Sequence, residues 1–224
     1  MEKRKPIKTR TINTEEQVYK IIFEHLNQNK PFRIMEMIPL ISSRFAKLNL
    51  EINENGIKKV LTSLIKKKLI VEGSVFTKGE ILKNQKRETI FRIIRNNPGI
   101  ITSKIIKKSR FNNFIVFWHL NILLKFNFIK KNMIENHQIF YDSSTTIEEA
   151  TYLYYFRNKK CRQIIEYLRK NDIGVTKTQI SSDLQFHFYT TAKYLTALEE
   201  IKIIRKEKIS NILLYFLIKK KDQY

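Results

Sequence analysis

The feature of the sequence that most limits its fold is an internal repeat. Two stretches, residues 90–129 and 165–204, carry the same types of residue at a constant offset of 75 positions, with no gap. The matched pairs are Ile90 with Ile165, Ile93 with Leu168, Gly99 with Gly174, Ile105 with Ile180, Phe111 with Phe186, Leu120 with Leu195, Leu123 with Leu198 and Ile129 with Ile204. Because most of these residues are large and apolar, the repeat predicts one supersecondary unit, with one core pattern, used twice.

Each copy has the pattern of a helix, a short helix, a longer helix and a hairpin. In the first copy, the apolar spacing and the capping residues predict helices over 77–97, 102–108 and 112–126, followed by a hairpin over 128–141. In the second copy they predict one long helix over 145–170, helices over 176–184 and 187–200, and a hairpin over 203–218. Pro98-Gly99 should end the first of these helices.

A third and weaker copy begins the chain. Leu61, Leu64 and Ile70 match Leu120, Leu123 and Ile129 at an offset of 59 positions. Helices are predicted over 14–26 and 33–48, where this copy needs an insertion, and a third helix follows Asn53. Only a short β-like run, Leu69–Val71, stands where the hairpin should be.

Three short helices followed by a two-stranded ribbon form a winged helix-turn-helix. The predicted class is therefore mainly α with small β wings (α+β), as tandem winged helix-turn-helix modules joined by long helices. The expected division is a basic flexible arm over 1–12, a degenerate winged-helix module over 13–76, and winged helix-turn-helix modules over 77–142 and 143–220.

Three short motifs of the middle copy resemble a known family. They are Asn97-Pro98-Gly99-Ile100, Trp118-His119-Leu120-Asn121-Ile122-Leu123, and Phe128-Ile129-Lys130-Lys131 with a hairpin that ends Ile139-Phe140-Tyr141. This pattern resembles that of the archaeal tandem winged helix-turn-helix transcriptional regulators, over residues 87–218 and more loosely before them. The resemblance implies this fold, and relatives in that family commonly bind DNA.

Charge points to a polyanionic partner. Lys and Arg number 43 against 21 Asp and Glu, a formal net charge of +22. Such an excess favours nucleic acid or an anionic membrane face, although A/T-rich coding sequence would also raise the lysine content. The single cysteine fits a reducing, cytoplasmic compartment. No apolar run reaches the roughly 18 residues of a membrane span.

The third helix of a helix-turn-helix enters the major groove, so its outer residues are the candidate DNA contacts. In the middle module these are Asn112, Asn113, Ile115 and Trp118, with His119 at the edge. Asn suits adenine and an apolar group suits a thymine methyl. Family members usually carry small polar residues here, so the alternative is that Ile115 and Trp118 contact a neighbouring module or a protein partner.

The last and first modules offer further DNA contacts. In the last, the outer residues of the third helix are His187, Tyr189, Thr190, Lys193 and Tyr194, and the wing adds Arg205, Lys206 and Lys208. In the first, the third helix carries Lys58, Lys59, Lys66, Lys67 and Lys68, which suit phosphate. The alternative for each is a solvated basic face.

Nothing in the sequence indicates catalysis. The four histidines lie outside metal-ligand spacing, and there is no glycine-rich phosphate loop or nucleophile motif, so we expect no enzyme activity, no cofactor and no metal. Cys161 is expected in the core. The aromatic stripe of Tyr152, Tyr155 and Phe156 is either core or the seam of a homodimer.

The expected function is therefore double-stranded DNA binding, as a transcriptional regulator. The main alternative is a winged-helix scaffold that binds proteins, of the endosomal-sorting or polymerase-subunit type. RNA binding is a third alternative.

Overall fold

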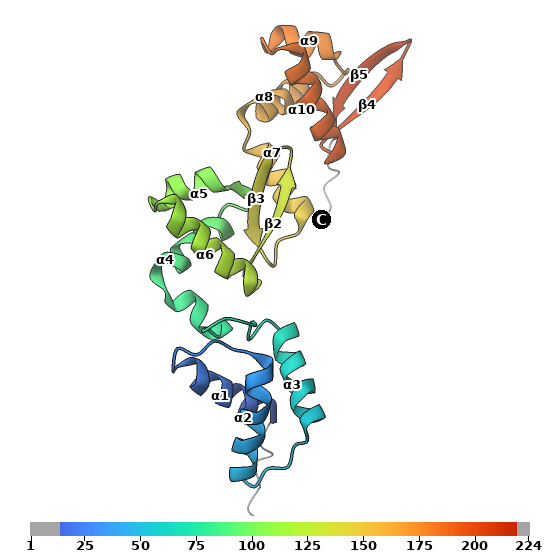
Figure 1. The fold of residues 1–224 in the computed structure, drawn as a ribbon. Helices are drawn as coiled ribbons and strands as arrows, with labels where there is room; N and C mark the ends of the chain where they lie inside the picture. Colours follow the sequence, from blue (N-terminus) through green and yellow to red (C-terminus); the bar gives the residue numbers. More distant parts are fainter. Residues whose placement is uncertain (1–13, 219–224) are drawn as a thin grey trace, which may run out of the picture. The chain divides into compact units, whose positions relative to one another are not determined.

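The computed structural model describes residues 14–218, and the basic arm predicted over 1–12 lies outside them. Within this range the protein is mainly helical, with small antiparallel sheets, as expected for the α+β class (Figure 1). The described chain forms two compact units, each built from two stretches. The first unit contains residues 14–91 and 111–128, and the second contains 92–110 and 129–218.

Three helices begin the first unit, as predicted: α1 (Thr14–Leu26), α2 (Ile34–Lys47) and α3 (Glu54–Lys66). The side chain of Asn53 accepts a hydrogen bond from the Gly56 amide and so caps α3. The three helices share one core, to which they contribute Val18, Ile21, Ile22, Leu26, Met37, Ile41, Phe45, Ile57, Leu61 and Leu64.

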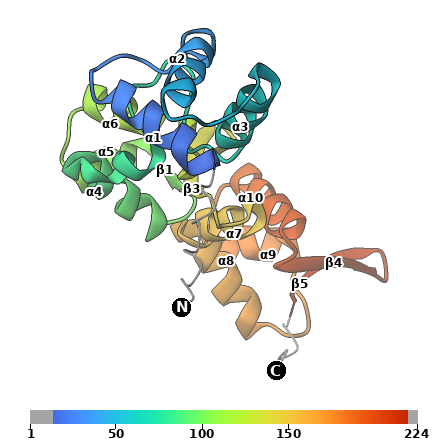
Figure 2. The ribbon, with the colours of Figure 1, turned by 90° about the horizontal axis from the view of Figure 1, so that it is seen from below.

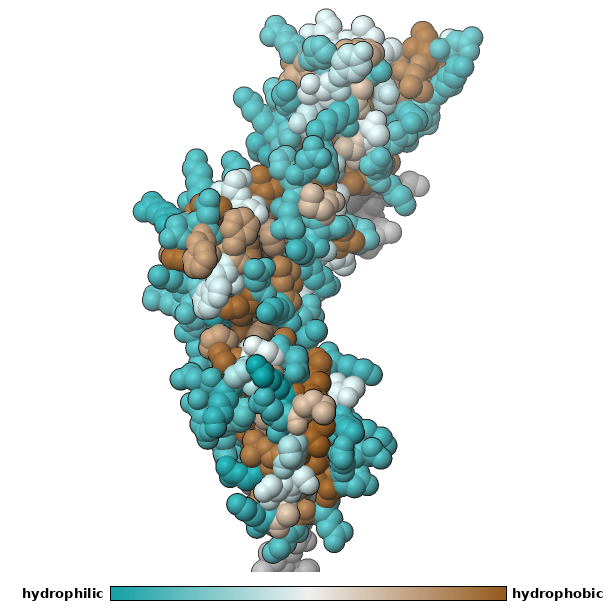
Figure 3. Space-filling view, in the orientation of Figure 1, coloured by the Kyte–Doolittle hydropathy of each residue, from teal (hydrophilic) through white to brown (hydrophobic). Residues whose placement is uncertain are grey.

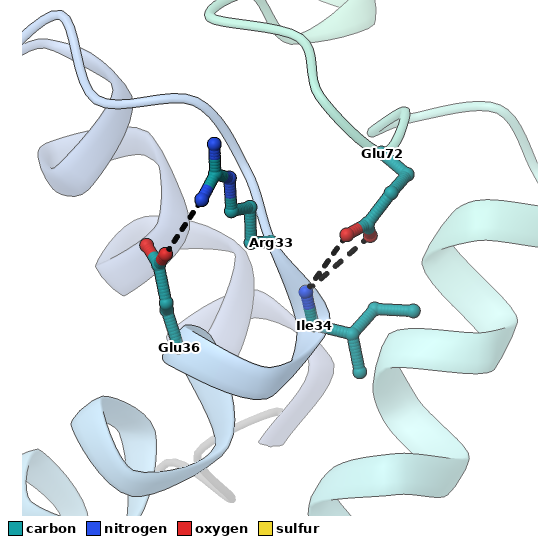
Figure 4. Close-up of polar contacts among 4 residues, drawn as sticks. All are labelled: Arg33, Ile34, Glu36 and Glu72. Carbon is teal, nitrogen blue, oxygen red and sulfur yellow. Dashed lines mark hydrogen bonds and ion pairs between the residues drawn. The ribbon is translucent and has the colours of Figure 1, made fainter.

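The β-like run predicted at Leu69–Val71 is not a strand. The backbone of the segment that follows it bonds instead to Phe32, whose amide donates to the Ser74 carbonyl and whose carbonyl accepts from Gly73. Figure 4 shows the second use of this segment: the Glu72 carboxylate accepts from the Ile34 amide at 3.3 Å, at the first turn of α2. The same turn carries the Arg33–Glu36 ion pair. The segment thus supplies hydrogen-bond partners to the N-terminus of α2 rather than forming a wing.

The helix predicted over 77–97 is broken in two. Thr77 and Glu80 form the expected capping box, but the helix that follows is a 3-10 helix, η1 (Lys78–Lys83). Asn84 is extended, with ψ of 115°, and its side chain accepts from the Arg87 amide at 3.1 Å. A new helix, α4 (Gln85–Arg95), starts there. The last helix of the first unit is α6 (Asn113–Lys125), capped by Asn112.

The second unit begins with the end of α4, then β1 (Ile100–Ile101) and α5 (Thr102–Ser109). The predicted hairpin is present as β2 (Ile129–Ile134) and β3 (His137–Asp142). Strand β1, which two residues were too few to predict, pairs antiparallel with β3 and gives a sheet of order β1-β3-β2.

The long helix predicted over 145–170 is two helices, α7 (Ile147–Phe156) and α8 (Lys159–Lys170). Asn158 lies between them in extended conformation and caps α8 through the amides of Lys160 and Cys161. The remaining elements match the prediction: α9 (Lys177–Asp183), α10 (Phe188–Glu200), and the hairpin of β4 (Ile204–Ile209) and β5 (Ile212–Leu217). Figures 1 and 2 show this hairpin extending away from α8, α9 and α10.

The repeat is visible in the element boundaries. Helix α6 and strands β2 and β3 each have a counterpart of the same length displaced by 75 positions, namely α10, β4 and β5. The pairing of Ile100 with Phe140 also recurs, as an isolated bridge between Val175 and Tyr215. Left-handed turns recur in the same way: Arg110 with Gln185, Asn127 with Lys202, and Glu135 with Ser210 all have positive φ.

The core of the second unit is formed mainly by its last five elements. Buried residues of this core include Ile164, Ile165 and Leu168 of α8, Ile180 of α9, Leu195 and Leu198 of α10, and Ile204 of β4. The hydroxyl of Ser181 in α9 donates to that of Thr191 in α10 at 3.0 Å, which fixes the two helices of the turn against each other. No helix within residues 14–218 is long and apolar enough to cross a membrane.

Candidate nucleic-acid interface

The exposed side of α3 is basic. Lys58, Lys59, Lys66 and Lys67 line one shallow depression along this helix, together with Asn55, Thr62 and Ser63. Lys58 is paired with Glu54, and Lys67 with Glu15, each at 2.6 Å. In the described part of the chain no ion pair engages Lys59 or Lys66. The unpaired ammonium groups of Lys59 and Lys66, beside hydroxyls, suit phosphate oxygens. Phosphate binding by Lys58 and Lys59 stays a prediction.

The exposed side of α6 is apolar to a greater extent than the sequence indicated. Phe114 is 79 % exposed, Phe117 49 % and Trp118 47 %. The hydropathy colouring shows hydrophobic side chains over this helix (Figure 3). Ile115, expected beside Trp118 on the open face, is half-buried. The outer stripe of α6 is therefore Phe114, Phe117 and Trp118.

The polar residues predicted on α6 differ in what they can still bind. Asn112 is exposed, but its side-chain oxygen accepts from the Ile115 amide at 2.9 Å, which leaves its NH₂ group as the outward donor. Asn113 is exposed in the first turn. His119, expected at the edge of the outer face, is instead buried at 3 % exposure. Its place one residue after Trp118 rotates it toward the core side of the helix.

A buried arginine underlies Trp118. Arg87 is 2 % exposed, and its guanidinium donates to the Ile81 carbonyl at 2.8 Å. The guanidinium lies 5.2 Å from the Phe76 ring centre and 5.5 Å from that of Trp118. Burial lowers the Arg87 pKa. Burial, and secondarily the charges of Arg87 and Lys86, lower the His119 pKa to about 4. One face of the Trp118 ring thus makes a cation–π contact with the buried guanidinium of Arg87.

The start of α10 carries a group of exposed rings. Tyr189 is 76 % exposed and stacks on the ring of His187 at 5.5 Å, with an interplanar angle of 23°. Phe188 meets Tyr189 edge-on at 6.2 Å, and the Lys177 ammonium lies 4.0 Å above the Phe188 ring. Thr190 is half-buried. These residues combine stacking surfaces, hydroxyls and positive charge on one exposed turn.

Further along α10, the predicted contacts are engaged within the protein. Lys193 is paired with Glu135 of the β2–β3 turn at 2.7 Å, and that hydrogen bond raises the Lys193 pKa. Tyr194 is half-buried, and its hydroxyl oxygen accepts from the Asn158 amide at 3.1 Å. To bind a phosphate, Lys193 must either leave Glu135 or use the N–H groups of its ammonium that this ion pair does not occupy.

The β4–β5 hairpin offers one fully available cation. Arg205 is paired with Glu207 and lies 4.5 Å from the Phe216 ring centre, while Lys206 is paired with Glu199 at 2.8 Å. Lys208 is exposed, and no other described residue pairs with it. The outer end of the hairpin is apolar, with Ile209, Ile212 and Leu213 exposed, and Figure 3 shows hydrophobic colour there.

Sequence reasoning missed several residues at the separate surfaces of the two units. Phe114, Phe117, Phe188 and Lys177 were not among the predicted contacts. The repeat itself contained a signal for the first, because an offset of 75 positions aligns Phe114 with Tyr189. The others depend on which way each helix faces, and that direction comes from packing.

Within residues 14–218, no group of three or more His, Cys, Asp or Glu side chains could hold a metal ion. Cys161 is buried, as predicted, and burial, with a smaller effect of Glu135, raises its pKa to about 12. A thiol with so high a pKa is a poor nucleophile.

Comparison with known proteins gives one informative relative. No protein-family model matches the chain. A protein of Methanocaldococcus jannaschii named as an uncharacterized HTH-type transcriptional regulator is 29 % identical over 138 residues. The alignment covers 62 % of this chain but 34 % of the relative, so the chain spans about a third of that protein's length.

Proposed function

We propose that this protein binds double-stranded DNA through tandem winged helix-turn-helix modules and regulates transcription. The proposal assigns modules to residues 13–76, 77–142 and 143–220, with α3, α6 and α10 as their third helices and the two hairpins as wings. The name of the relative, an HTH-type transcriptional regulator, supports regulation as the role.

The observation that carries the proposal is the surface formed by α10 and β4. Helix α10 follows α9 after a left-handed turn at Gln185, as the third helix of a helix-turn-helix does. It presents His187, Tyr189 and Lys193, and the adjoining strand presents Arg205, Lys206 and Lys208. A helix for the major groove beside a basic ribbon is the arrangement by which winged helices bind duplex DNA.

Titration of a random-sequence duplex at several salt concentrations tests this function. We expect micromolar or tighter binding at low salt, with log affinity falling linearly against log salt by about 0.9 per phosphate contact. Joint replacement of Lys193, Arg205 and Lys206 by Ala should flatten that slope by about two to three units, and Lys208→Ala alone by about one.

The control is a triple variant of exposed lysines outside the third helices and wings: Lys20→Ala, Lys30→Ala and Lys47→Ala. It removes the same charge and should leave most of the slope in place. If the two triple variants reduce the slope equally, binding is diffuse attraction to a basic protein and the assigned surface is wrong.

The apolar stripe of α6 keeps the scaffold alternative testable. A protein partner docked on Phe114, Phe117 and Trp118 would be lost in Phe117→Ala, while duplex binding by the rest of the chain would not change. If the stripe binds DNA instead, Phe117→Ala changes the affinity for duplex DNA, and the variant retains every protein that co-purifies with the unaltered chain.

A further inference from the structure

Two exposed aromatic residues occupy the same place in the two repeats. Phe114 is the second residue of α6, and Tyr189 is the second residue of α10. They are 79 % and 76 % exposed, although their neighbours differ: Asn113 against Phe188, and Ile115 against Thr190. Leaving a ring in water forgoes the stabilisation that its burial would give. A ring in this place in both copies therefore calls for a use outside the core.

The Tyr189 ring is also held in position. His187 stacks on it at 5.5 Å, and Phe188 contacts it edge-on at 6.2 Å. The Lys177 ammonium lies 4.0 Å above Phe188, so a positive charge borders the group. The Tyr189 ring is thus contacted by His187 and Phe188 and remains largely exposed to solvent. The positive charge of Lys177 beside this group would attract phosphates.

The chemistry of the ring selects what it can recognise. The first turn of a helix in the major groove meets the edges of the bases. The ring that Phe114 and Tyr189 share neither donates nor accepts a conventional hydrogen bond, so what the two positions have in common can discriminate only by apolar contact. The hydroxyl that Tyr189 carries in addition is separated from the ring by Tyr189→Phe. The only apolar group that the four base pairs present in the major groove is the C5-methyl of thymine.

We infer that Phe114 and Tyr189 each contact thymine C5-methyl groups, so that this protein prefers thymine-containing duplexes through the methyl itself. The inference rests on the proposed function and specifies what two of its third helices read. The basic side chains that contact the DNA phosphates, Lys208 among them, supply affinity without sequence preference, and the two rings supply the preference.

The test compares two duplexes of the same A/T-rich sequence, one with thymine and one with deoxyuridine, which lacks only the methyl. The full-length protein should bind the thymine duplex about fourfold more tightly for each methyl contacted, and about 15-fold if both rings contribute. Phe114→Ala with Tyr189→Ala should remove the preference. Tyr189→Phe keeps the ring and should retain it. Met35→Ala removes an apolar side chain of similar exposure (81 %) from α2, and should also retain it.

Each other outcome is decisive. Equal binding of both duplexes by the unaltered protein overturns the inference and leaves duplex binding intact. A methyl preference that survives in the double Ala variant, or that Tyr189→Phe abolishes, overturns the assignment to the rings. Failure to bind any duplex overturns the proposed function as well.

Discussion

The guanidinium of Arg87 lies 5.5 Å from the centre of the Trp118 ring, although the sequence predicted Trp118 to contact DNA, a neighbouring module or a protein partner. Arg87 is buried, and the Ile81 carbonyl is the single described hydrogen-bond partner of its guanidinium. The indole therefore compensates for part of the hydration that this charge has lost. Trp118 serves the interior of the first unit with one ring face and leaves the other exposed.

Trp118→Ala should accordingly destabilise the fold. We expect the free energy of unfolding to fall by about 1–2 kcal/mol, because a desolvated cation loses one of two aromatic neighbours. Urea denaturation of the purified protein measures this change. Phe117→Ala is the matched control, since Phe117 is equally exposed but has no described cation beside it. Equal losses in the two variants would contradict the role given to Trp118.

Acid should weaken the first unit through His119. Its pKa in the folded state is about 4, below the 6.5 of an ordinary histidine, so folding favours the neutral ring. The stabilisation is complete above pH 6.5 and is lost as the pH falls from 6.5 toward 4, by up to roughly 3 kcal/mol. His119→Gln should flatten the stability profile across this window. An unchanged profile in that variant would contradict the effect assigned to His119.

Two acids should restrain duplex binding. Glu135 holds Lys193, and Glu199 holds Lys206, at 2.7 and 2.8 Å. Glu135→Gln or Glu199→Gln removes the acid that competes with phosphate for one lysine, so each should raise duplex affinity severalfold at low salt. The salt slope should change little, because Lys193 and Lys206 already count among the phosphate contacts. Glu166→Gln frees Arg169 on α8 and serves as the control for a change of net charge. An increase of the same size in all three variants would show that only net charge matters.

Cys161 should report unfolding. Its thiol is buried, and its pKa of about 12 leaves almost no thiolate at pH 8. We expect a disulfide-exchange reagent to label the native protein only at the rate of its opening, and to label it immediately in denaturant. Rapid labelling of the native protein would mean that α8 is not packed as described.

Gly99 should not tolerate a side chain. Its φ is +80°, and a Cβ there would come within 2.3 Å of the Ala150 carbonyl oxygen. Gly99→Ala should lower the thermal midpoint by several degrees, equivalent to about 2–4 kcal/mol. Gly79→Ala is the control, because nothing lies within 4 Å of its Cβ position and no positive φ constrains it. A neutral Gly99→Ala variant would contradict the close approach at Ala150.

Much of the architecture could be predicted because the repeat fixes register. The matched apolar residues predicted the ends of α6, α10 and both hairpins to within one or two residues. Prediction failed where one polar side chain decides the backbone. Asn84 and Asn158 each end one helix and cap the next, and apolar spacing alone continued through both. The segment after α3 failed for another reason, because its partners at Phe32 and Ile34 are distant in sequence.

The sequence predicted the types of residue at the candidate sites better than the direction in which their side chains point. The basic residues of α3, α10 and β4 are exposed as expected. The rotation of α6 about its axis was misjudged, so that Phe114 and Phe117 replaced Ile115, and His119 turned inward. Ion pairs such as Lys193 with Glu135 join residues 58 positions apart, and a sequence pattern carries no information on them.

The left-handed turns shared by the repeats are positions where the thermal stability of the protein could be raised. Arg110, Gln185 and Lys202 adopt positive φ without being glycine or asparagine. Each such residue costs roughly 1 kcal/mol relative to glycine. Replacing these residues by glycine one at a time should therefore stabilise the fold without changing a residue of α10 or an exposed aromatic ring. A heat-resistant version of the protein could then accept destabilising changes at its binding surface that the natural chain could not survive.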